Sequence, residues 1–273
     1  MSKRVVVTGA ASGIGAASAE ELRSRGARVI GLDVRPDPDA GVLECDVRDQ
    51  DSVDRAMAEA IERLGGVDVL INNAGLGTPQ SAGARPDAGA LAVLDVNLVG
   101  PWRVTAAALP ELRASRGRVV NVASGLAVVT IPFAPAYCMS KHGLVAYSDS
   151  LRLEHGDAIH VTTVYPGYVR TPIHAESKAQ GLGLEGTIPP ESLGQVARTV
   201  ARAALGRPVR DLATTRRGTI SYALARRSPR RVVDAVIAAR IERLARQGRF
   251  ESTGLAGEYV ARLTGSGSRA TRA

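Results

Sequence analysis

Short runs of β-branched and other apolar residues alternate along this chain with longer stretches whose apolar residues recur every three or four positions. The short runs lie at residues 4–8, 28–33, 41–45, 67–72, 118–123 and 159–165. Most are apolar at almost every position, which is typical of parallel strands buried on both faces. The longer stretches include residues 14–25, 51–64, 136–154 and 191–205. This order predicts an α/β fold, a doubly wound parallel sheet with helices on both faces.

The alternation ends with an expected seventh strand at residues 210–215, and the sequence changes character beyond it. We therefore predict one domain over residues 1–215 and a basic helical C-terminal extension over residues 216–264. Residues 265–273 are rich in Gly, Ser and Arg and predict a disordered tail. Residues 76–90 and 178–190 are rich in Gly and Pro and predict loops at the ligand edge of the sheet.

Composition supports a folded chain and divides it by charge. Hydrophobic residues make up 45% and charged residues 23%, so a full core can form and general disorder is excluded. Aromatic residues make up only 3%, too few for a base-stacking surface, so we expect no nucleic-acid partner. The formal net charge of +8 is uneven: residues 1–197 carry −4, and the chain from Arg198 onward carries +12.

Nothing in the sequence predicts a membrane span, a secretory signal or a metal site. No apolar run approaches the length of a spanning helix, about 18 residues, and the N-terminus lacks the apolar stretch of a signal peptide. The two cysteines, Cys45 and Cys138, lack metal-ligand spacing and are expected to be small buried residues in a reducing compartment. These observations predict a cytoplasmic protein.

A glycine-rich turn follows the first strand and opens the first helix. It reads Thr8-Gly9-Ala10-Ala11-Ser12-Gly13-Ile14-Gly15. Glycines let the backbone approach a pyrophosphate closely, and the helix N-terminus supplies amide donors and a partial positive charge. A tight strand–helix turn without a ligand would leave the same pattern. Its position after the first strand favours a dinucleotide site of the Rossmann type.

Asp33 closes the second strand, 18 positions after Gly15. A carboxylate there can accept hydrogen bonds from the ribose hydroxyls of NAD and would repel the 2′-phosphate of NADP. Arg35 is the only nearby group that argues for NADP, and a loop-capping role for Asp33 remains open. We expect NAD, with NADP as the alternative.

With five further segments, the turn makes the sequence similar to the short-chain dehydrogenase/reductase family over residues 4 to about 210. Residues 8–15 resemble the family's T-G-x3-G-x-G motif, residues 72–75 its N-N-A-G and residues 166–171 its P-G-x-V-x-T. Tyr137 and Lys141 form a Y-x3-K, with Ser124 thirteen residues before the tyrosine. Asn97 falls at the family's catalytic asparagine, and Asp46 where an aspartate contacts adenine. Compact members end soon after the seventh strand, whereas about 60 residues follow it here.

The resemblance implies a catalytic set of Asn97, Ser124, Tyr137 and Lys141. It also implies a nicotinamide cofactor held by the motif residues, which are Gly9, Ser12, Gly13, Ile14, Gly15, Asp33, Asp46, Val47, Asn73, Ala74, Gly75, Tyr137, Lys141, Pro166, Gly167, Val169 and Thr171. Lys141 would hold the nicotinamide ribose, and Asn97 would fix a water that links Lys141 to solvent. Related proteins are dimers or tetramers, so a homodimer or homotetramer is expected.

The spacing of Tyr137 and Lys141 suits proton transfer to or from an alcohol oxygen. The two residues are four apart on the predicted helix 136–154 and share a face. A free tyrosine, with a pKa of about 10, is a poor base near neutral pH. We expect the Lys141 ammonium to lower the pKa of Tyr137, and Ser124 to orient the substrate oxygen.

The expected substrate is a hydrophobic secondary alcohol or ketone, such as a steroid-like, terpenoid or acyl-derived compound. This follows from the mostly apolar residues expected around the pocket, among them Gly125, Leu126, Phe133, Tyr168, Ile173 and Leu182. The sequence thus predicts an NAD-dependent alcohol dehydrogenase or carbonyl reductase. An NADPH-dependent 3-oxoacyl reductase of the same family is one alternative. A non-catalytic NAD-binding regulator is another, from a different class.

Residues 229–250 predict a basic amphipathic helix. Its apolar positions at helical spacing are Val232, Val233, Val236, Ile237, Ile241 and Leu244, and its arginines lie largely elsewhere. Packing on the domain or on a second subunit would explain the pattern. Attachment to an anionic membrane surface is the functional alternative. Either way, we expect the extension to lie outside the catalytic set.

Overall fold

The computed structural model describes residues 2–180, 182, 190–248, 250, 255 and 257–264. The predicted disordered tail, residues 265–273, and most of the second half of the predicted loop 178–190 lie outside the described residues.

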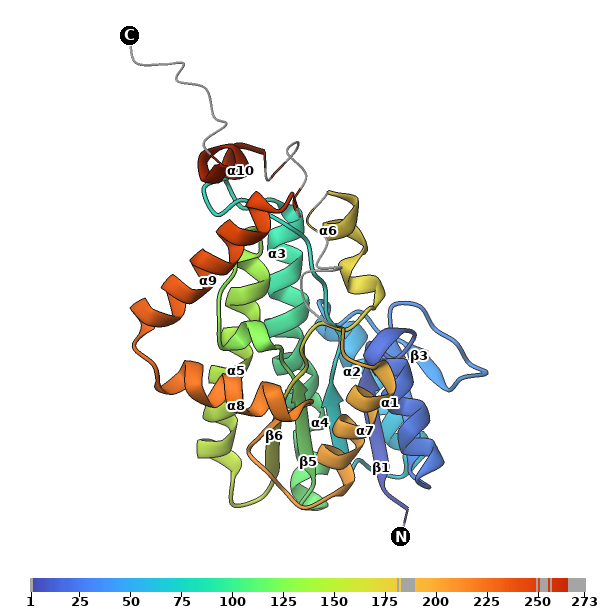
Figure 1. Cartoon of the computed structure of the whole chain (residues 1–273). Coiled ribbons are helices and arrows are strands. Elements are labelled where there is room, and N and C mark those ends of the chain that lie inside the picture. Colours follow the sequence, from blue (N-terminus) through green and yellow to red (C-terminus); the bar gives the residue numbers. More distant parts are fainter. Residues whose placement is uncertain are drawn as a thin grey trace.

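A seven-stranded parallel sheet forms the centre of the molecule (Figure 1). The strands are β1 (Arg4–Thr8), β2 (Arg28–Asp33), β3 (Val42–Glu44), β4 (Val69–Asn72), β5 (Arg118–Val122), β6 (His160–Tyr165) and β7 (Asp211–Ala213). They are ordered β3-β2-β1-β4-β5-β6-β7, so the chain reverses its direction of winding between β1 and β4. In such a sheet, ligands bind beyond the carboxyl ends of the strands at this reversal. The predicted doubly wound sheet is confirmed.

Helices cover both faces of the sheet (Figure 1). The α-helices of the described chain are α1 (Gly13–Ser24), α2 (Gln50–Leu64), α3 (Ala88–Leu94), α4 (Gly100–Ala114), α5 (Pro135–His155), α6 (Ala175–Ala179), α7 (Leu193–Leu205), α8 (Arg216–Arg227), α9 (Arg230–Arg246) and α10 (Gly257–Thr264). One apolar cluster joins the sheet to α1 and α7, and a second joins it to α2, α4 and α5. Strand β1 contributes to both clusters: Val5 and Val7 belong to the cluster with α1 and α7, and Val6 belongs to the cluster with α2, α4 and α5. Its uninterrupted apolar run therefore follows from burial on both faces.

The segment between β4 and α4 contains more helix than the sequence pattern predicted. Helix α3 begins inside the stretch expected to be a loop, where the Asp87 side chain accepts a hydrogen bond from the backbone N–H of Ala90 (2.7 Å). A π-helix, η1 (Asp95–Val99), continues from α3 into α4. The short apolar α3 lacks the long periodic pattern that identifies a helix in a sequence. Two 3₁₀ turns, η2 (Gly125–Ala127) and η3 (Pro172–His174), follow β5 and β6.

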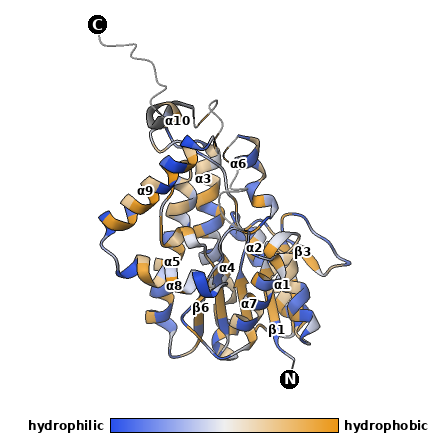
Figure 2. Ribbon diagram, viewed as in Figure 1, coloured by the Kyte–Doolittle hydropathy of each residue, from blue (hydrophilic) through white to orange (hydrophobic). Residues whose placement is uncertain are grey.

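The C-terminal extension is helical, as predicted, but the amphipathic pattern of α9 divides differently. Val233 and Ile241 are buried, whereas Val232 and Val236 are exposed. Hydrophobic and hydrophilic residues alternate along α9 (Figure 2). Ile237 and Leu244 are half-buried, so α9 packs an apolar face on the molecule as predicted, while Val232 and Val236 stay exposed outside that face. None of the helices in the described part of the chain is long and apolar enough to span a bilayer.

Candidate active site

The glycine-rich turn packs so closely against the end of β4 and against its own backbone that two of its positions have no space for a side chain. Gly9 and Gly13 have φ angles of +66° and +56°, which favour glycine. A Cβ on Gly9 would lie 2.7 Å from the Cα of Ala74, and a Cβ on Gly15 would overlap the carbonyl oxygen of Gly9. The turn fits a pyrophosphate approaching the N-terminus of α1.

The end of β4 is tied to this turn by hydrogen bonds. The Asn73 amide donates to the carbonyl oxygens of Thr8 (3.0 Å) and Gly9 (3.2 Å). The Thr8 hydroxyl accepts from the backbone N–H groups of Asn73 and Ala74, both at 3.0 Å. These bonds hold Asn73, Ala74 and the following Gly75 beside the turn, so the N-N-A-G segment fixes the floor of the predicted cofactor site.

Asp33 is buried at the end of β2 and has polar partners within the chain. One carboxylate oxygen accepts from the backbone N–H of Ala11 (3.0 Å), and the other from that of Arg35 (3.0 Å). The Arg35 side chain lies 3.7 Å from Asp33 and donates to the Ser12 hydroxyl (3.0 Å). The loop-capping role left open for Asp33 is thus present. A carboxylate oxygen has two lone pairs, so these bonds leave capacity to accept ribose hydroxyls.

Asp46 and Val47 follow β3 on the same edge of the sheet. Arg48 forms an ion pair with the Asp46 carboxylate (2.6 Å), and its hydrogen bonds hold the pKa of Asp46 below the usual value. Val47 is buried, and its side chain would lie 2.8 Å from a Cβ on Gly100. The structure brings both residues to the cofactor edge but shows Asp46 already engaged by an arginine.

The segment after β6 closes the other side of the predicted cofactor site. A Cβ on Gly13 would lie 3.3 Å from the methyl group of Thr171, so the two segments face each other. Val169 forms a β-bridge with Glu191, whose carboxylate fills the space beside Gly167. The Pro166 carbonyl accepts from the backbone N–H of Gly125 at 2.9 Å.

Ser124 and Tyr137 lie close enough for the Ser124 side chain to influence the pKa of Tyr137. Ser124 follows β5 and caps η2, accepting from the backbone N–H of Leu126 (3.2 Å), and Tyr137 lies in the first turn of α5. Burial raises the pKa of Tyr137 to about 12, although the Ser124 side chain lowers it in part. The expectation that Lys141 lowers this pKa is therefore wrong for this structure. Desolvation of the phenolate outweighs the other influences.

Lys141 lies one turn after Tyr137 and is buried without a carboxylate partner among the described residues. Its ammonium donates to the Val122 carbonyl (3.0 Å) and lies 5.7 Å from the centre of the Tyr137 ring. Burial lowers the pKa of Lys141 to about 8. Two adjacent groups that lose or gain a proton at perturbed pKa values are typical of a functional site.

Asn97 is held at the centre of the π-helix η1. Its amide pairs with the backbone of Leu76, accepting from the N–H at 2.7 Å and donating to the carbonyl at 2.9 Å. It also donates to the hydroxyl of Ser140 (3.1 Å), next to Lys141 on α5. The predicted catalytic residues thus lie in η1, just after β5 and in α5, and Asn97 is linked to α5 through Ser140. Single π-helical turns of this kind are often found at functional sites.

Two predicted substrate residues, Gly125 and Leu126, directly follow Ser124. The backbone N–H of Leu126 donates a hydrogen bond to the Ser124 hydroxyl. At Gly125, the position that a Cβ would take is filled by the Tyr222 hydroxyl of α8. Gly125 is therefore a contact point for the extension, and sequence reasoning missed Tyr222. No local pattern in α8 signals this contact.

The remaining predicted substrate residues form two groups. Ile173 lies beside Gly77, where a Cβ would be 3.3 Å from Ile173 and 3.7 Å from the Tyr137 ring. The buried Tyr168 packs its ring against His174, with centroids 4.9 Å apart. Phe133 and Leu182 instead contact the C-terminal helix, which sequence analysis had placed outside the site.

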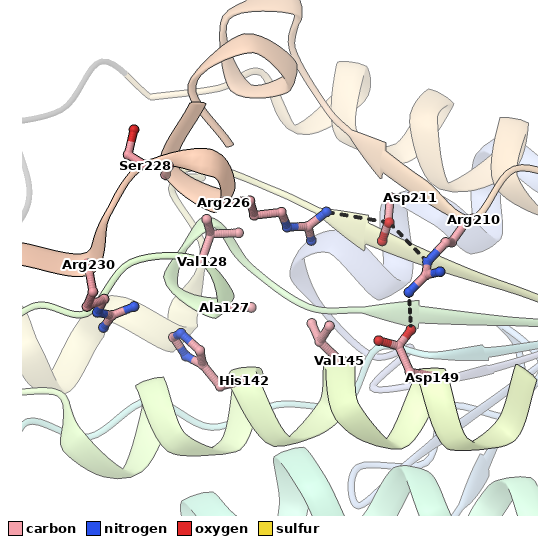
Figure 3. Close-up of a pocket in the computed structure, with 11 residues that line it drawn as sticks. Ala127, Val128, His142, Val145, Asp149, Arg210, Asp211, Arg226, Ser228 and Arg230 are labelled. Carbon is pink, nitrogen blue, oxygen red and sulfur yellow. Dashed lines mark hydrogen bonds and ion pairs between the residues drawn. The ribbon is translucent and has the colours of Figure 1, made fainter. Parts of the chain in front are cut away.

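A cavity of about 500 Å³ lies elsewhere, between α5, η2 and the start of the extension (Figure 3). Ion pairs close one end, from Arg226 to Asp211 (3.5 Å), Asp211 to Arg210 (3.5 Å) and Arg210 to Asp149 (2.9 Å). None of the four predicted catalytic residues lines it. The cavity is bordered by the outer side of α5 and does not include the catalytic groups.

A family model of short chain dehydrogenases matches residues 3–181, well over half of the chain. The chain belongs to the short chain dehydrogenase family. As a short chain dehydrogenase it is an oxidoreductase of a family that uses nicotinamide cofactors. The match ends before the C-terminal extension, so α8, α9 and α10 lie outside it.

Relatives of this short chain dehydrogenase share most of its length. Oxidoreductase UcpA of Escherichia coli strain K12 is 34% identical over 223 residues, which cover 76% of this chain and 83% of UcpA. L-fucose dehydrogenase of Bos taurus is 32% identical over 204 residues, 71% of this chain and 76% of that protein. The ligand-free structure of aldohexose dehydrogenase from Thermoplasma acidophilum superposes with a TM-score of 0.72. It shares 27% identity and covers 84% of this chain and 96% of that one.

Proposed function

We propose that this protein is an NAD(H)-dependent oxidoreductase that interconverts a hydrophobic secondary alcohol and its ketone. The observation that carries the proposal is the proximity of Ser124 and Lys141 to Tyr137, with the Lys141 ammonium 5.7 Å from the centre of the Tyr137 ring. The bound nicotinamide would supply or accept the hydride. The chain's own groups must then orient the substrate oxygen and move its proton.

Tyr137 is the proposed acid and base. With its pKa raised to about 12, the hydroxyl stays protonated near neutral pH and can donate to the oxygen of a ketone as it is reduced. Ser124 holds the same oxygen through a second hydrogen bond. Alcohol oxidation needs the phenolate, so its rate is expected to rise with pH. These roles favour ketone reduction at neutral pH.

Lys141 and Asn97 are proposed to return the proton. Lys141, with a pKa near 8, can exchange a proton at physiological pH, whereas a lysine of ordinary pKa cannot do so readily. Asn97 braces the segment after β4 and contacts Ser140, which precedes Lys141 on α5. A water held between Asn97 and Lys141 would complete the route to solvent.

We favour NAD over NADP because a buried carboxylate ends β2. A 2′-phosphate beside Asp33 would meet its negative charge in a poorly solvated position. Arg35 is the specific observation that favours NADP, since its guanidinium lies over Ser12 of the phosphate turn. It is already paired with Asp33 and Ser12, so it would have to leave both to bind a phosphate.

The substrate class follows from the side chains expected to surround it. Ile173, Phe133 and Leu182 offer apolar surface. Two of the relatives are named for sugars, whose hydroxyls call for polar partners. The apolar surroundings here favour a hydrophobic ketone. A 3-oxoacyl reductase using NADPH and a non-catalytic NAD-binding regulator are the alternatives.

A cofactor and substrate screen tests the proposal. The full-length protein is assayed with NADH and NADPH against hydrophobic ketones and a 3-oxoacyl thioester, and with NAD and NADP against the matching alcohols. We expect turnover of ketones with NADH, and a loss of about 10³-fold in Tyr137→Phe with unchanged NAD binding. Tyr147→Phe, on the same helix, is the control and should retain activity. NADPH-linked turnover of the thioester alone would favour the 3-oxoacyl reductase, and NAD binding without turnover the regulator.

We further propose that the protein is cytoplasmic and forms a homo-oligomer through the outer faces of α4 and α5. Both cysteines are free and buried, as expected in a reducing compartment. Large apolar side chains are exposed on this surface, including Trp102 and Leu153. Trp102 contacts Tyr147 with ring centroids 5.8 Å apart, so the two helices present one continuous face. Sedimentation equilibrium would test this, and a monomer at micromolar concentration would contradict it.

A peripheral contact with anionic membrane is proposed for the outer face of the extension. Ile220 and Leu224 of α8 are each 62% exposed, and Val232 and Val236 of α9 are exposed beside arginines. Apolar groups among cationic ones suit the boundary between lipid headgroups and acyl chains. The charge of +12 from Arg198 onward would strengthen the attraction to anionic lipid.

A further inference from the structure

The C-terminal helix α10 lies against two segments that carry predicted substrate residues. Val260 of α10 and Leu182 are buried in one apolar cluster, with Phe133, Phe250 and Leu255 packed around them. Leu182 lies just beyond α6, and Phe133 just before α5. In Figure 1, α10 occupies the same end of the molecule as α6. One short helix near the end of the chain therefore bridges the two segments that border the substrate side.

An aromatic contact fixes the position of α10 on Phe133. The rings of Tyr259 and Phe133 meet edge to face, with centroids 5.4 Å apart and planes at 89°. Phe133 has a φ of +61°, a left-handed conformation that is costly for a bulky residue and persists only where its surroundings hold it. Two contacts hold it here: Tyr259 against the ring, and the backbone N–H of Gln80, which donates to its carbonyl at 3.0 Å.

This contact is close in the chain to the proposed acid. Phe133 lies four residues before Tyr137, in the turn that precedes α5. Gly77, three residues before Gln80, lies against the other side of the same region: a Cβ there would be 3.7 Å from the Tyr137 ring. Residues 77–80 thus run from the Tyr137 ring to the Phe133 backbone, and α10 packs on the Phe133 side chain.

The extension is also held at its beginning. The hydroxyl of Tyr222 on α8 packs against Gly125, the residue after Ser124. Arg230, at the start of α9, donates to the hydroxyl of Thr130 at 3.0 Å. The extension is therefore fixed to the body at α8 and at the start of α9, before α10 returns to Phe133.

We propose that α10 forms a wall of the substrate site and that Tyr259 and Val260 determine which substrates it accepts. The proposal rests on the proposed function, because it assumes that the site takes a hydrophobic ketone. An aromatic edge and an aliphatic side chain favour substrates whose apolar portion extends beyond the carbonyl toward Phe133 and Leu182. The extension thereby sets specificity, while the body carries out the reaction.

A chain-length series of methyl ketones tests this in the full-length protein. Tyr259→Ala is expected to raise KM for the longest ketones about tenfold relative to the shortest. Tyr259→Phe keeps the ring and should match the wild type. Val236→Ala, a similar truncation on the exposed face of α9, is the control. An unaltered dependence of KM on chain length in Tyr259→Ala would overturn the proposal.

Binding measurements separate failure of this proposal from failure of the proposed function. The NAD-loaded wild type and Tyr259→Ala are titrated with the same ketones by calorimetry, after circular dichroism has shown that both are folded. If the wild type reduces none of the ketones, the proposed function is wrong, and binding decides the role of α10. Weaker binding of only the long ketones by Tyr259→Ala supports the wall. Equal binding, or no binding by either protein, refutes it.

Discussion

Helices α5 and α9 are both long, yet they bury different kinds of side chain. On α5, Lys141, Ser140 and Ser148 are buried among aliphatic residues. Each has a partner: Lys141 the Val122 carbonyl, Ser140 the Asn97 amide, and Ser148 the Asn121 amide. Burying such groups costs free energy that the hydrogen bonds only offset, so their presence indicates a function other than stability.

On α9, by contrast, the buried residues are apolar and some apolar residues are exposed. Its buried residues Val233, Ile241 and Ala245 are all apolar, while Val232 and Val236 face outward. An outward apolar residue adds little to the stability of the isolated chain, and it indicates a partner when several lie together. The helix with the proposed catalytic residues thus buries polar groups, whereas the extension helix buries only apolar groups and leaves others exposed.

The largest expected change in stability and activity follows from the substitution Lys141→Met on α5. Its folded pKa near 8 is below the unfolded value of about 10.4, so below pH 8 the folded protein must hold a buried charge. This cost disappears as pH rises from 8 to about 10.4. At pH 7 we expect the free energy of unfolding of Lys141→Met to exceed that of the wild type by about 3 kcal/mol, at 1.36 kcal/mol per pKa unit. The variant should also lose most of its activity. Urea unfolding from pH 7 to 10 measures the difference, and a constant gap would contradict the burial argument.

A buried apolar truncation on α9 should have the opposite sign. Ile241→Ala is expected to lower the free energy of unfolding by about 2 kcal/mol, because it removes buried aliphatic surface. NAD affinity should stay unchanged, since α9 does not contact the glycine-rich turn. Thermal melts and NAD titration check both. A loss of NAD binding would show that the extension supports the body more broadly than these contacts indicate.

The cofactor preference gives a smaller effect, confined to the body. Asp33→Ser removes the carboxylate that opposes a 2′-phosphate and releases Arg35 from its ion pair. We expect the ratio of kcat/KM for NAD to that for NADP to fall about tenfold or more, near 1.4 kcal/mol. Asp37→Ser, in the following loop, serves as the matched control. An unchanged ratio would mean that Asp33 only caps the loop.

The smallest stability effect is expected on the outer face of α9. Val236→Ser should change the free energy of unfolding by less than about 0.5 kcal/mol, because the side chain is 65% exposed. If this face contacts lipid, the variant should sediment less with vesicles containing phosphatidylserine at low ionic strength. Equal sedimentation of variant and wild type, or none by either, would remove the membrane proposal.

The sequence was sufficient for the sheet, because its strands are apolar on both faces and its main helices have a strong period. The boundaries of the long helices agree within about two residues, for example Pro135–His155 against the predicted 136–154. The glycine turn was equally readable, since close backbone approach leaves few residues other than glycine. The order of the motifs also placed Asn97, Ser124 and Tyr137 near one another.

The rest depended on contacts that no local pattern records. The approach of Tyr222 to Gly125 and of Tyr259 to Phe133 joins residues about 100 or more positions apart. The pKa of Tyr137 was misjudged for a related reason: spacing showed that Lys141 is near, but only the structure shows that desolvation of the Tyr137 hydroxyl raises its pKa. Charge separated the extension from the body, but it carried no signal for the contacts of α8 and α10 with Gly125 and Phe133.

The π-helix η1 also fixes the number of residues between α3 and α4. It runs without interruption from α3 into α4, and its wider turn brings Asn97 to Leu76 and Ser140. Each residue of an α-helix advances by about 100°. Removing one residue from Asp95–Val99 would restore a regular helix but rotate α3 and Asn97 away from these partners. The segment therefore fixes the number of residues between Leu94 and Gly100 more strictly than it fixes the identity of its exposed side chains.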